Sequence, residues 1–160
     1  MKIKNIKGKI ILDSLGNKTI EIAINGKFKG SAPIGLSRGN NEVNHFPSYG
    51  IPIGLVNRTL NKGLSGFSFN EFKDLLVVEE ILFDLDSSEK LAKIGGNAII
   101  ALEYALLRAG ANKESVWRFL NSYADELPVP IGECIGGGKH NIFGGDIQEI
   151  LVIPYAENFR

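Results

Sequence analysis

Residues that could handle protons or bind a substrate gather near the carboxyl end of the sequence. His140 follows a glycine run, and Gln148 and Glu149 lie eight and nine residues beyond it. Carboxylate and imidazole groups are the side chains that most often transfer protons. Because Glu149 lies in an apolar stretch and an unpaired buried carboxylate is costly, its side chain should face solvent or a polar site. For His140 by itself, an ordinary exposed histidine is the alternative.

A second candidate, Ser37, lies in a long segment at residues 33–50 (PIGLSRGNNEVNHFPSYG), whose Gly, Asn and Pro content fits neither helix nor strand. Long loops in compact domains often carry function. A serine in a glycine-flanked mobile loop suits a gating role, and a plain turn residue is the alternative. The glycines at 136–138 could offer N–H groups to a phosphate, but no helix follows them, so a flexible turn is favoured.

Strand-like segments must position these residues. Residues 3–12, 19–24 and 27–32 have the composition and alternation of strands. Turn-forming residues at 13–17 separate the first two, and the Asn-Gly pair at 25–26 favours a tight hairpin between the second and third. The pattern predicts an antiparallel meander of three strands.

Helices are predicted after the loop. Apolar residues at helical spacing indicate helices over 53–60, from caps at 68–71 onward, over 96–109 before Gly110, and over 113–123. We expect Trp117 in the core. The segment 96–109 is the clearest, because its alanines and leucines recur at steps of three and four.

The sequence pattern changes from helical to extended after the last predicted helix. Residues 127–130 (LPVP) are extended, and residues 147–153 form an apolar strand after a glycine-rich loop. We therefore predict an α+β protein, with a three-stranded antiparallel meander and a helical subdomain in residues 1–125 and two appended strands in residues 126–160.

Composition limits the classes of function. Eighteen basic and eighteen acidic residues cancel, so the chain lacks the basic excess of a nucleic-acid-binding protein. The single cysteine, Cys134, is expected to be a small buried hydrophobe in a reducing compartment. No apolar run approaches the roughly 20 residues of a membrane-spanning helix. We expect a cytoplasmic protein that binds neither nucleic acid nor membrane.

Five segments, in order along the chain, resemble the enolase (phosphopyruvate hydratase) family. Residues 13–21 (DSLGNKTIE) are similar to its DSRGNPTVE, residues 33–39 (PIGLSRG) to its PSGASTG loop, and residues 85–99 to its LDGT followed by LGANAI. Residues 127–130 match its LPVP, and residues 137–140 (GGKH) with Gln148 and Glu149 reproduce its GGKH or GGSH and QE at the same spacing. The chain resembles an enolase amino-terminal capping domain joined to the first strands of the barrel.

This resemblance implies a lyase that dehydrates 2-phosphoglycerate to phosphoenolpyruvate, removing a proton next to a carboxylate while Mg2+ ions stabilise the dianionic intermediate. It implies that Ser37 is a magnesium ligand supplied when its loop closes. It implies that His140 and Gln148 bind substrate, and that Glu149 lines the same site and is the candidate catalytic residue.

The sequence departs from the family's pattern at several positions. Leu15 replaces the arginine of DSRG, Arg38 replaces the threonine after the loop serine, and Glu133 and Gly136 replace the two asparagines of NVING. The later acidic metal ligands and the catalytic lysines have no counterpart in these 160 residues. We therefore expect no turnover and no tight Mg2+ binding by this chain alone.

Two interpretations follow. In the first, the chain is the amino-terminal part of an enolase-like lyase, either as a piece of a longer polypeptide that carries the barrel or as one half of a split enzyme whose barrel another polypeptide supplies. In the second, it is a non-catalytic enolase relative that acts as a binding or interaction module. Two strands of an incomplete barrel would expose sheet edges and apolar faces, so either a complementary barrel polypeptide or self-association should cover residues 127–153.

Overall fold

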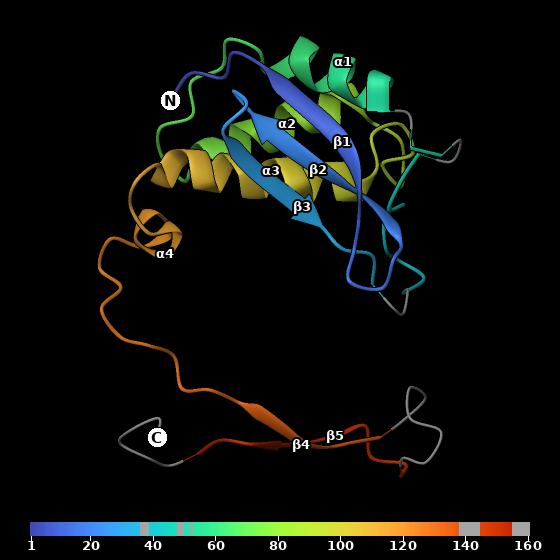
Figure 1. Ribbon diagram of the computed structural model, residues 1–160, viewed down its shortest axis with the longest axis vertical. Coiled ribbons are helices and arrows are strands. Elements are labelled where there is room, and N and C mark those ends of the chain that lie inside the picture. Colours follow the sequence, from blue (N-terminus) through green and yellow to red (C-terminus); the bar gives the residue numbers. More distant parts are fainter. Residues whose placement is uncertain (36–38, 48–49, 52, 138–144, 155–160) are drawn as a thin grey trace. The chain divides into compact units, whose positions relative to one another are not determined.

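The computed structural model describes residues 1–35, 39–47, 50–51, 53–137 and 145–154 (Figure 1). The chain divides into two compact units, Met1–Tyr123 and Ala124–Arg160. None of the helices in the described ranges combines the length and the apolar character needed to span a bilayer.

The first unit opens with the predicted meander. β1 (Ile6–Leu12), β2 (Lys18–Ile24) and β3 (Phe28–Ala32) pair antiparallel in the order β1-β2-β3. Asn25 and Gly26 have φ angles of 52° and 68°, which are the left-handed values that a tight hairpin requires. The prediction of three antiparallel strands is confirmed.

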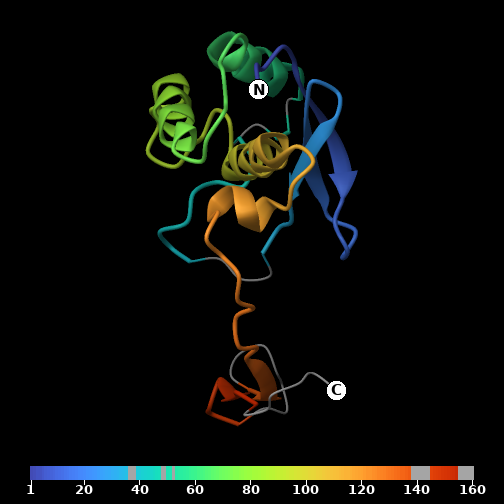
Figure 2. The ribbon, with the colours of Figure 1, turned by 90° about the vertical axis from the view of Figure 1, so that its left-hand side faces the viewer.

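In the described part of the chain, four helices follow the long loop. They are α1 (Ile53–Leu64), α2 (Asp74–Leu85), α3 (Gly96–Ala111) and α4 (Val116–Leu120). Figure 2 views the sheet close to edge-on and shows α2 and α3 on one side of it. None of the helices described in this unit covers the other face of the sheet (Figure 2), which we call the open face.

The end of the helical part differs from the prediction. α3 continues past Gly110, where a Cβ atom would lie 2.3 Å from Cζ of Phe119, so this glycine makes room for a ring. α4 has five residues, and Trp117 is 49% exposed, so its expected place in the core is wrong. Phe119 packs against the core with its ring centroid 6.0 Å from that of Phe69. A helix this short turns only one large side chain inward.

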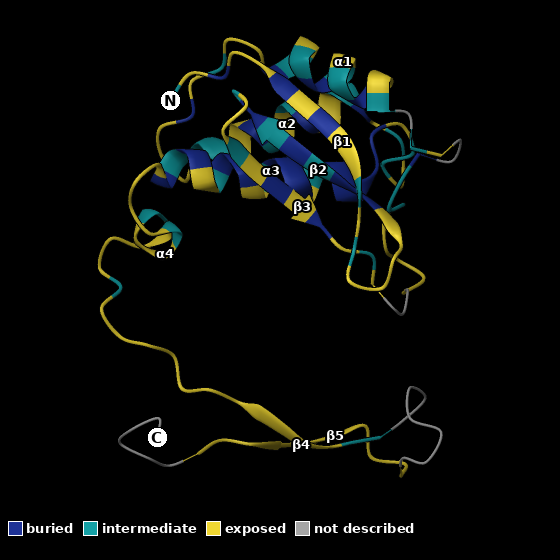
Figure 3. Ribbon diagram, in the orientation of Figure 1, coloured by how far each residue is buried: buried dark blue, intermediate teal, exposed yellow. Residues whose placement is uncertain are grey.

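α3 packs directly on β3 through small residues. Ala98, Ala101 and Ala105 are almost completely buried (Figure 3). A Cβ atom on Gly30 of β3 would lie 2.2 Å from the carbonyl oxygen of Ala101 and 2.6 Å from the amide nitrogen of Ala105. The helix and strand backbones therefore touch at a separation that only glycine permits.

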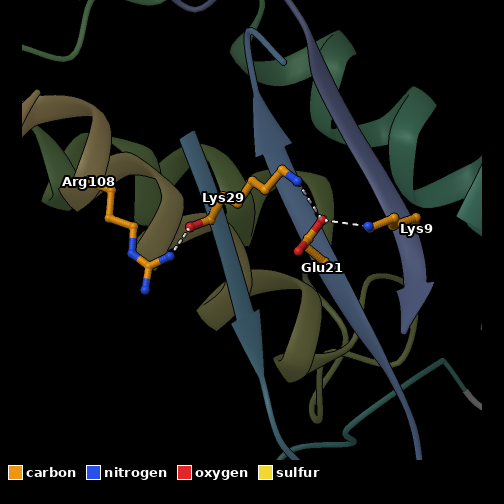
Figure 4. Close-up of polar contacts among 4 residues, drawn as sticks. All are labelled: Lys9, Glu21, Lys29 and Arg108. Atoms are coloured by element: carbon orange, nitrogen blue, oxygen red, sulfur yellow. Dashed lines mark hydrogen bonds and ion pairs between the residues drawn. The ribbon is translucent and has the colours of Figure 1, made fainter. Parts of the chain in front are cut away.

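Side chains from the helices form hydrogen bonds with backbone groups at the outer edges of β1 and β3. The amide oxygen of Asn57 on α1 accepts from the N–H of Gly8 at 2.6 Å, and that of Asn61 accepts from the N–H of Ile6 at 2.9 Å. Each asparagine also donates its side-chain N–H to the carbonyl of the same residue of β1. On β3, Arg108 of α3 donates to the carbonyl oxygen of Lys29 at 2.8 Å (Figure 4).

The second unit is a two-stranded antiparallel sheet. β4 (Gly132–Gly136) pairs with β5 (Glu149–Val152), with an irregularity between Glu133 and Ile135. Cys134 is exposed, so its expected burial is wrong, because two strands without a packed layer bury little. A three-stranded antiparallel sheet, helices and then a two-stranded sheet confirm the predicted α+β class.

Replacing Gly30 with alanine tests the contact between α3 and β3. We expect Gly30→Ala to lower the free energy of unfolding by about 3 kcal/mol, because the added methyl overlaps helix backbone that cannot move aside. Urea unfolding followed by circular dichroism measures this. Gly54→Ala is the matched control, since a Cβ atom at this helical position meets nothing within 4 Å. Equal stability of the two variants would contradict the packing argument.

Glu103 of α3 gives the fold a pH dependence. Burial, together with the neighbouring carboxylate of Glu79, raises the pKa of Glu103 to about 7. The folded state therefore binds a proton at the Glu103 carboxylate more tightly than the unfolded state does. The contribution of this proton to the free energy of unfolding is complete below pH 4.5 and is lost as the pH rises to about 7. We expect urea unfolding to show this loss at roughly 1–2 kcal/mol, since solvent screens part of the effect.

The variant Glu103→Gln should remove this pH dependence and raise stability at pH 8, because the amide carries no charge. Glu80→Gln is the control, since Glu80 is an exposed carboxylate on α2. A wild-type stability that stays level across this pH window would show that Glu103 is ionised throughout.

Candidate functional site

The loop that carries Ser37 leaves the sheet at a buried polar clamp. Asn97, at the start of α3, donates from Nδ2 to the Thr19 hydroxyl at 3.1 Å and to the Ala32 carbonyl at 3.2 Å. The Thr19 hydroxyl donates to the same carbonyl. Thr19 and Asn97 are 2% and 6% exposed, so these bonds lie in the interior and fix the residue from which the loop departs.

The segment resembling the enolase opening forms a tight turn beside this clamp. One carboxylate oxygen of Asp13 accepts from the N–H groups of Leu15 at 2.9 Å and Asn17 at 2.8 Å. Desolvation acts to raise the pKa of Asp13, but hydrogen bonds from Asn17, Leu15 and Ile34 outweigh it and hold the pKa below its ordinary value. Leu15 is 61% exposed, so the residue at the arginine position of the motif is not needed for the fold.

The returning half of the loop is bound to the first turn of α3. Gly96 donates its N–H to the Asn44 carbonyl at 2.7 Å, and Asn97 donates its N–H to the His45 carbonyl at 3.1 Å. Gly95 has a φ of 86°, and a Cβ atom there would lie 2.8 Å from the His45 carbonyl oxygen. These N–H groups at the helix start therefore hold the loop rather than an anion.

A small turn at residues 39–42 follows Ser37 in the sequence. Gly39 donates its N–H to Oε1 of Glu42 at 2.9 Å, and Glu42 donates its N–H to the Gly39 carbonyl at 3.2 Å. Lys90 donates from Nζ to the Asn40 carbonyl at 2.9 Å. Ser37 itself lies outside the described residues, so its role as a magnesium ligand stays a prediction.

His45 is a residue to which the sequence analysis assigned no function. Its Nε2 lies 3.8 Å from Oε2 of Glu42, and its buried Nδ1 has no hydrogen-bond partner among the residues that the structure describes. The side chain is 13% exposed at the point where the loop meets α3. The backbone carbonyl of His45 is held by Asn97 of α3, and this contact between residues far apart in the sequence has no local signal.

Asp86, in the segment resembling the family's LDGT, has a structural role. Its carboxylate is completely buried and accepts from the N–H groups of Ser88, Lys93 and Ile94 and from the Ser88 hydroxyl. Burial acts to raise the pKa of Asp86, but the hydrogen bonds from Ser88, Ile94 and Lys93 outweigh it and hold the pKa below its ordinary value. Asp86 thereby shapes the connection that leads into α3.

The second unit places Gln148 and Glu149 beside the glycine run. Glu149 pairs with Gly136, and Gly137 donates its N–H to the Gln148 carbonyl at 2.7 Å. Both side chains are exposed. A Cβ atom on Gly137 would lie 2.3 Å from the Ile147 carbonyl oxygen, so this glycine is set in a close backbone contact rather than in a flexible turn. His140 lies outside the described residues.

A further carboxylate lies on the same face as Glu149. A Cβ atom on Gly136 would lie 2.2 Å from Oε1 of Glu133, so the Glu133 side chain occupies the space above this glycine. Opposed residues of antiparallel strands project to the same face. Glu133 and Gly136 both replace asparagines of the family's pattern, and the two replacements depend on each other. The Glu133 side chain fills the space that a side chain at position 136 would occupy.

The described residues do not by themselves form a magnesium centre. Across the described ranges, no group of three or more His, Cys, Asp or Glu side chains could hold a metal ion. Mg2+ prefers a compact set of oxygen ligands, and the hairpin offers Gln148, Glu149 and Glu133 on an exposed surface. The donors among these described residues do not fit the ion.

Curated proteins that are similar to this chain are enolases. The chain is 35% identical to an enolase of Methanothermobacter thermautotrophicus over 95% of its own length and 38% of the relative's. It is 34% identical to an enolase of Thermoplasma acidophilum (99% and 41%) and 32% identical to enolase 2 of Lactococcus lactis (99% and 40%). The chain thus spans about two fifths of the length of these relatives.

The family assignment rests on the first unit. The family model of the enolase amino-terminal domain matches residues 3–120, which include the meander, the clamped loop and the helices α1 to α4. This match covers well over half of the chain, and it contains the Asp13 turn, the Asp86 connection and the Asn97 clamp. The chain therefore belongs to the enolase family, through its amino-terminal domain.

Proposed function

We propose that this chain supplies the capping domain and the first barrel strands of an enolase-type lyase, and that a complementary barrel polypeptide completes the active site. The reaction would be dehydration of 2-phosphoglycerate to phosphoenolpyruvate. The observation that carries the proposal is the double anchoring of the loop around Ser37. Asn97 fixes its departure at Ala32, and the first turn of α3 fixes its return at Asn44 and His45.

Such anchoring suits a loop that closes over a substrate. Fixed ends restrict the motion to the segment between them, so that closure reproducibly delivers a side chain to one place. We propose that Ser37 is that side chain, and that His140 and Gln148 contact the substrate. Glu149 is the proposed catalytic carboxylate, because its exposed position leaves it free to meet a bound molecule.

The role proposed for magnesium depends on the partner. In enolase-type chemistry magnesium would supply positive charge that offsets the charge of the substrate carboxylate. We propose that the remaining ligands and the catalytic lysines come from the barrel, as the resemblance to enolases implies. The lone cysteine continues to favour a cytoplasmic location.

The alternative is a non-catalytic interaction module of the enolase family. Glu133 favours it, because this chain places a second negative charge on the face of Glu149 where the family's pattern has a neutral asparagine. A phosphorylated, carboxylated substrate is strongly anionic, and like charges disfavour its approach.

Complementation distinguishes these functions. We expect the purified chain with Mg2+ to show no phosphoenolpyruvate formation from 2-phosphoglycerate by ultraviolet absorbance. Mixing it with the barrel portion of the Methanothermobacter enolase should produce activity. In that mixture Glu149→Gln should lower kcat by roughly 100-fold or more, the usual contribution of an acid–base group. Glu126→Gln, an exposed carboxylate before the hairpin, should leave it unchanged.

Either of two outcomes would contradict the proposal. Turnover by the chain alone would remove the need for a partner. Absence of activity in a mixture that forms a complex would favour the interaction module. Complex formation is checked separately by sedimentation, because we propose that the partner covers the exposed apolar side chains of β5 and its surroundings, namely Ile147, Ile150, Leu151, Val152 and Ile153. Self-association of the chain alone would make a second copy the covering partner.

A further inference from the structure

His45 projects from a fixed stretch of backbone. Its carbonyl oxygen accepts from the N–H of Asn97 at 3.1 Å, and the carbonyl of the preceding residue, Asn44, accepts from the N–H of Gly96 at 2.7 Å. Two bonds to the first turn of α3 thus hold the backbone on which the imidazole ring is mounted. The ring itself lies mostly in the interior, because its side chain is 13% exposed. Its direction is therefore set by the fold.

The surroundings of the ring decide which nitrogen carries the proton. Nδ1 is buried and has no hydrogen-bond partner among the described residues, whereas Nε2 lies 3.8 Å from Oε2 of Glu42. A neutral ring protonated at Nδ1 would bury an unpaired N–H donor and would turn the lone pair of Nε2 toward a carboxylate. A ring protonated at Nε2 leaves only a lone pair unpaired and turns a donor toward that carboxylate. The geometry therefore favours the Nε2–H form.

Glu42 connects this ring to the turn at residues 39–42. While Oε2 faces His45, Oε1 accepts from the N–H of Gly39 at 2.9 Å. The separation of 3.8 Å exceeds a direct hydrogen bond, so His45 acts by the attraction of its N–H dipole for the carboxylate charge, which the burial of the ring strengthens. Lys90 also bonds this turn, but it donates to the Asn40 carbonyl and not to Glu42. The orientation of the carboxylate therefore depends on His45.

A packing role alone does not account for a histidine at this position. An apolar side chain of similar size would fill the same space and would leave no nitrogen buried without a partner. Such buried polar atoms are uncommon in folded proteins, because they have lost water without gaining another bond. The cost at Nδ1 is explained if Nε2 serves Glu42.

We propose that His45 is a positioning residue, whose Nε2–H orients the Glu42 carboxylate so that this carboxylate fixes the backbone of Gly39. Its importance for catalysis rests on the function proposed above, because Ser37 precedes Gly39 by two residues in the sequence. The contacts that join His45, Glu42 and Gly39 lie within the first unit, so they can be tested on the chain alone and without substrate.

Nuclear magnetic resonance of the full chain at mildly alkaline pH tests the protonation of the ring. Nitrogen chemical shifts distinguish a protonated from a bare ring nitrogen, and we expect a protonated Nε2 and a bare Nδ1. The chain has one other histidine, His140, so the spectrum of His45→Gln identifies which signals belong to His45. A ring protonated at Nδ1 would overturn the proposal, because it would have no donor to turn toward Glu42.

Two substitutions separate positioning from packing. His45→Gln keeps an N–H donor at about the reach of Nε2, whereas His45→Leu fills space without a donor. We expect hydrogen exchange at the Gly39 amide to be about fivefold faster in His45→Leu than in wild type, the factor associated with one ordinary hydrogen bond, and to be restored in His45→Gln. The amides of Leu15 and Asn17, which bond Asp13 in a different turn, are internal controls.

Similar exchange at Gly39 in the two variants, whether raised or not, would assign His45 to packing and overturn the proposal. Faster exchange in His45→Leu at the control amides as well would do the same, because it would show a general loss of structure. Failure of the complementation experiment would leave the exchange result standing, since exchange is measured on the chain alone. The positioning contact and the enolase-type function are thus judged by different measurements.

Discussion

The contact between Gly30 and the backbone of α3 constrains the whole first unit. Because β3 has no side chain at this point, the helix lies against the strand, and its small residues Ala101 and Ala105 complete the fit. The position of α3 then fixes its first turn, which holds the loop at Asn44 and His45. One close approach between two backbones thus determines where the ends of the candidate site loop are placed.

Much of this fold could be predicted, because its signals are local. Alternating isoleucines and the Asn-Gly pair at 25–26 predicted the meander, and evenly spaced alanines predicted α3. Contacts between distant residues gave no such signal: Asn57 meets Gly8 across 49 positions, and Asn97 meets Ala32 across 65. The burial of Trp117 was wrongly predicted for a related reason. Hydrophobicity describes a side chain but not whether a layer exists beneath it.

The candidate site was predictable as a set of positions rather than as a geometry. The resemblance to the enolase family identified four candidate positions, namely Ser37, His140, Gln148 and Glu149. The structure places Gln148 and Glu149 at the Gly136 end of the hairpin. Ser37 and His140 lie outside the described residues. The dependence of Glu133 on Gly136 could not be predicted from the sequence, since only the three-dimensional structure shows the side chain of one residue filling the space above another.

The asparagines of α1 have a consequence for how the first unit opens. Asn57 and Asn61 act as a side-chain substitute for a fourth strand, so the amides of Ile6 and Gly8 owe their shielding to a helix. If α1 frays, these two amides become available for hydrogen exchange although β1 and β2 remain paired. Fraying of α1 should therefore be detected first as hydrogen exchange at the outer edge of β1, before β1 separates from β2.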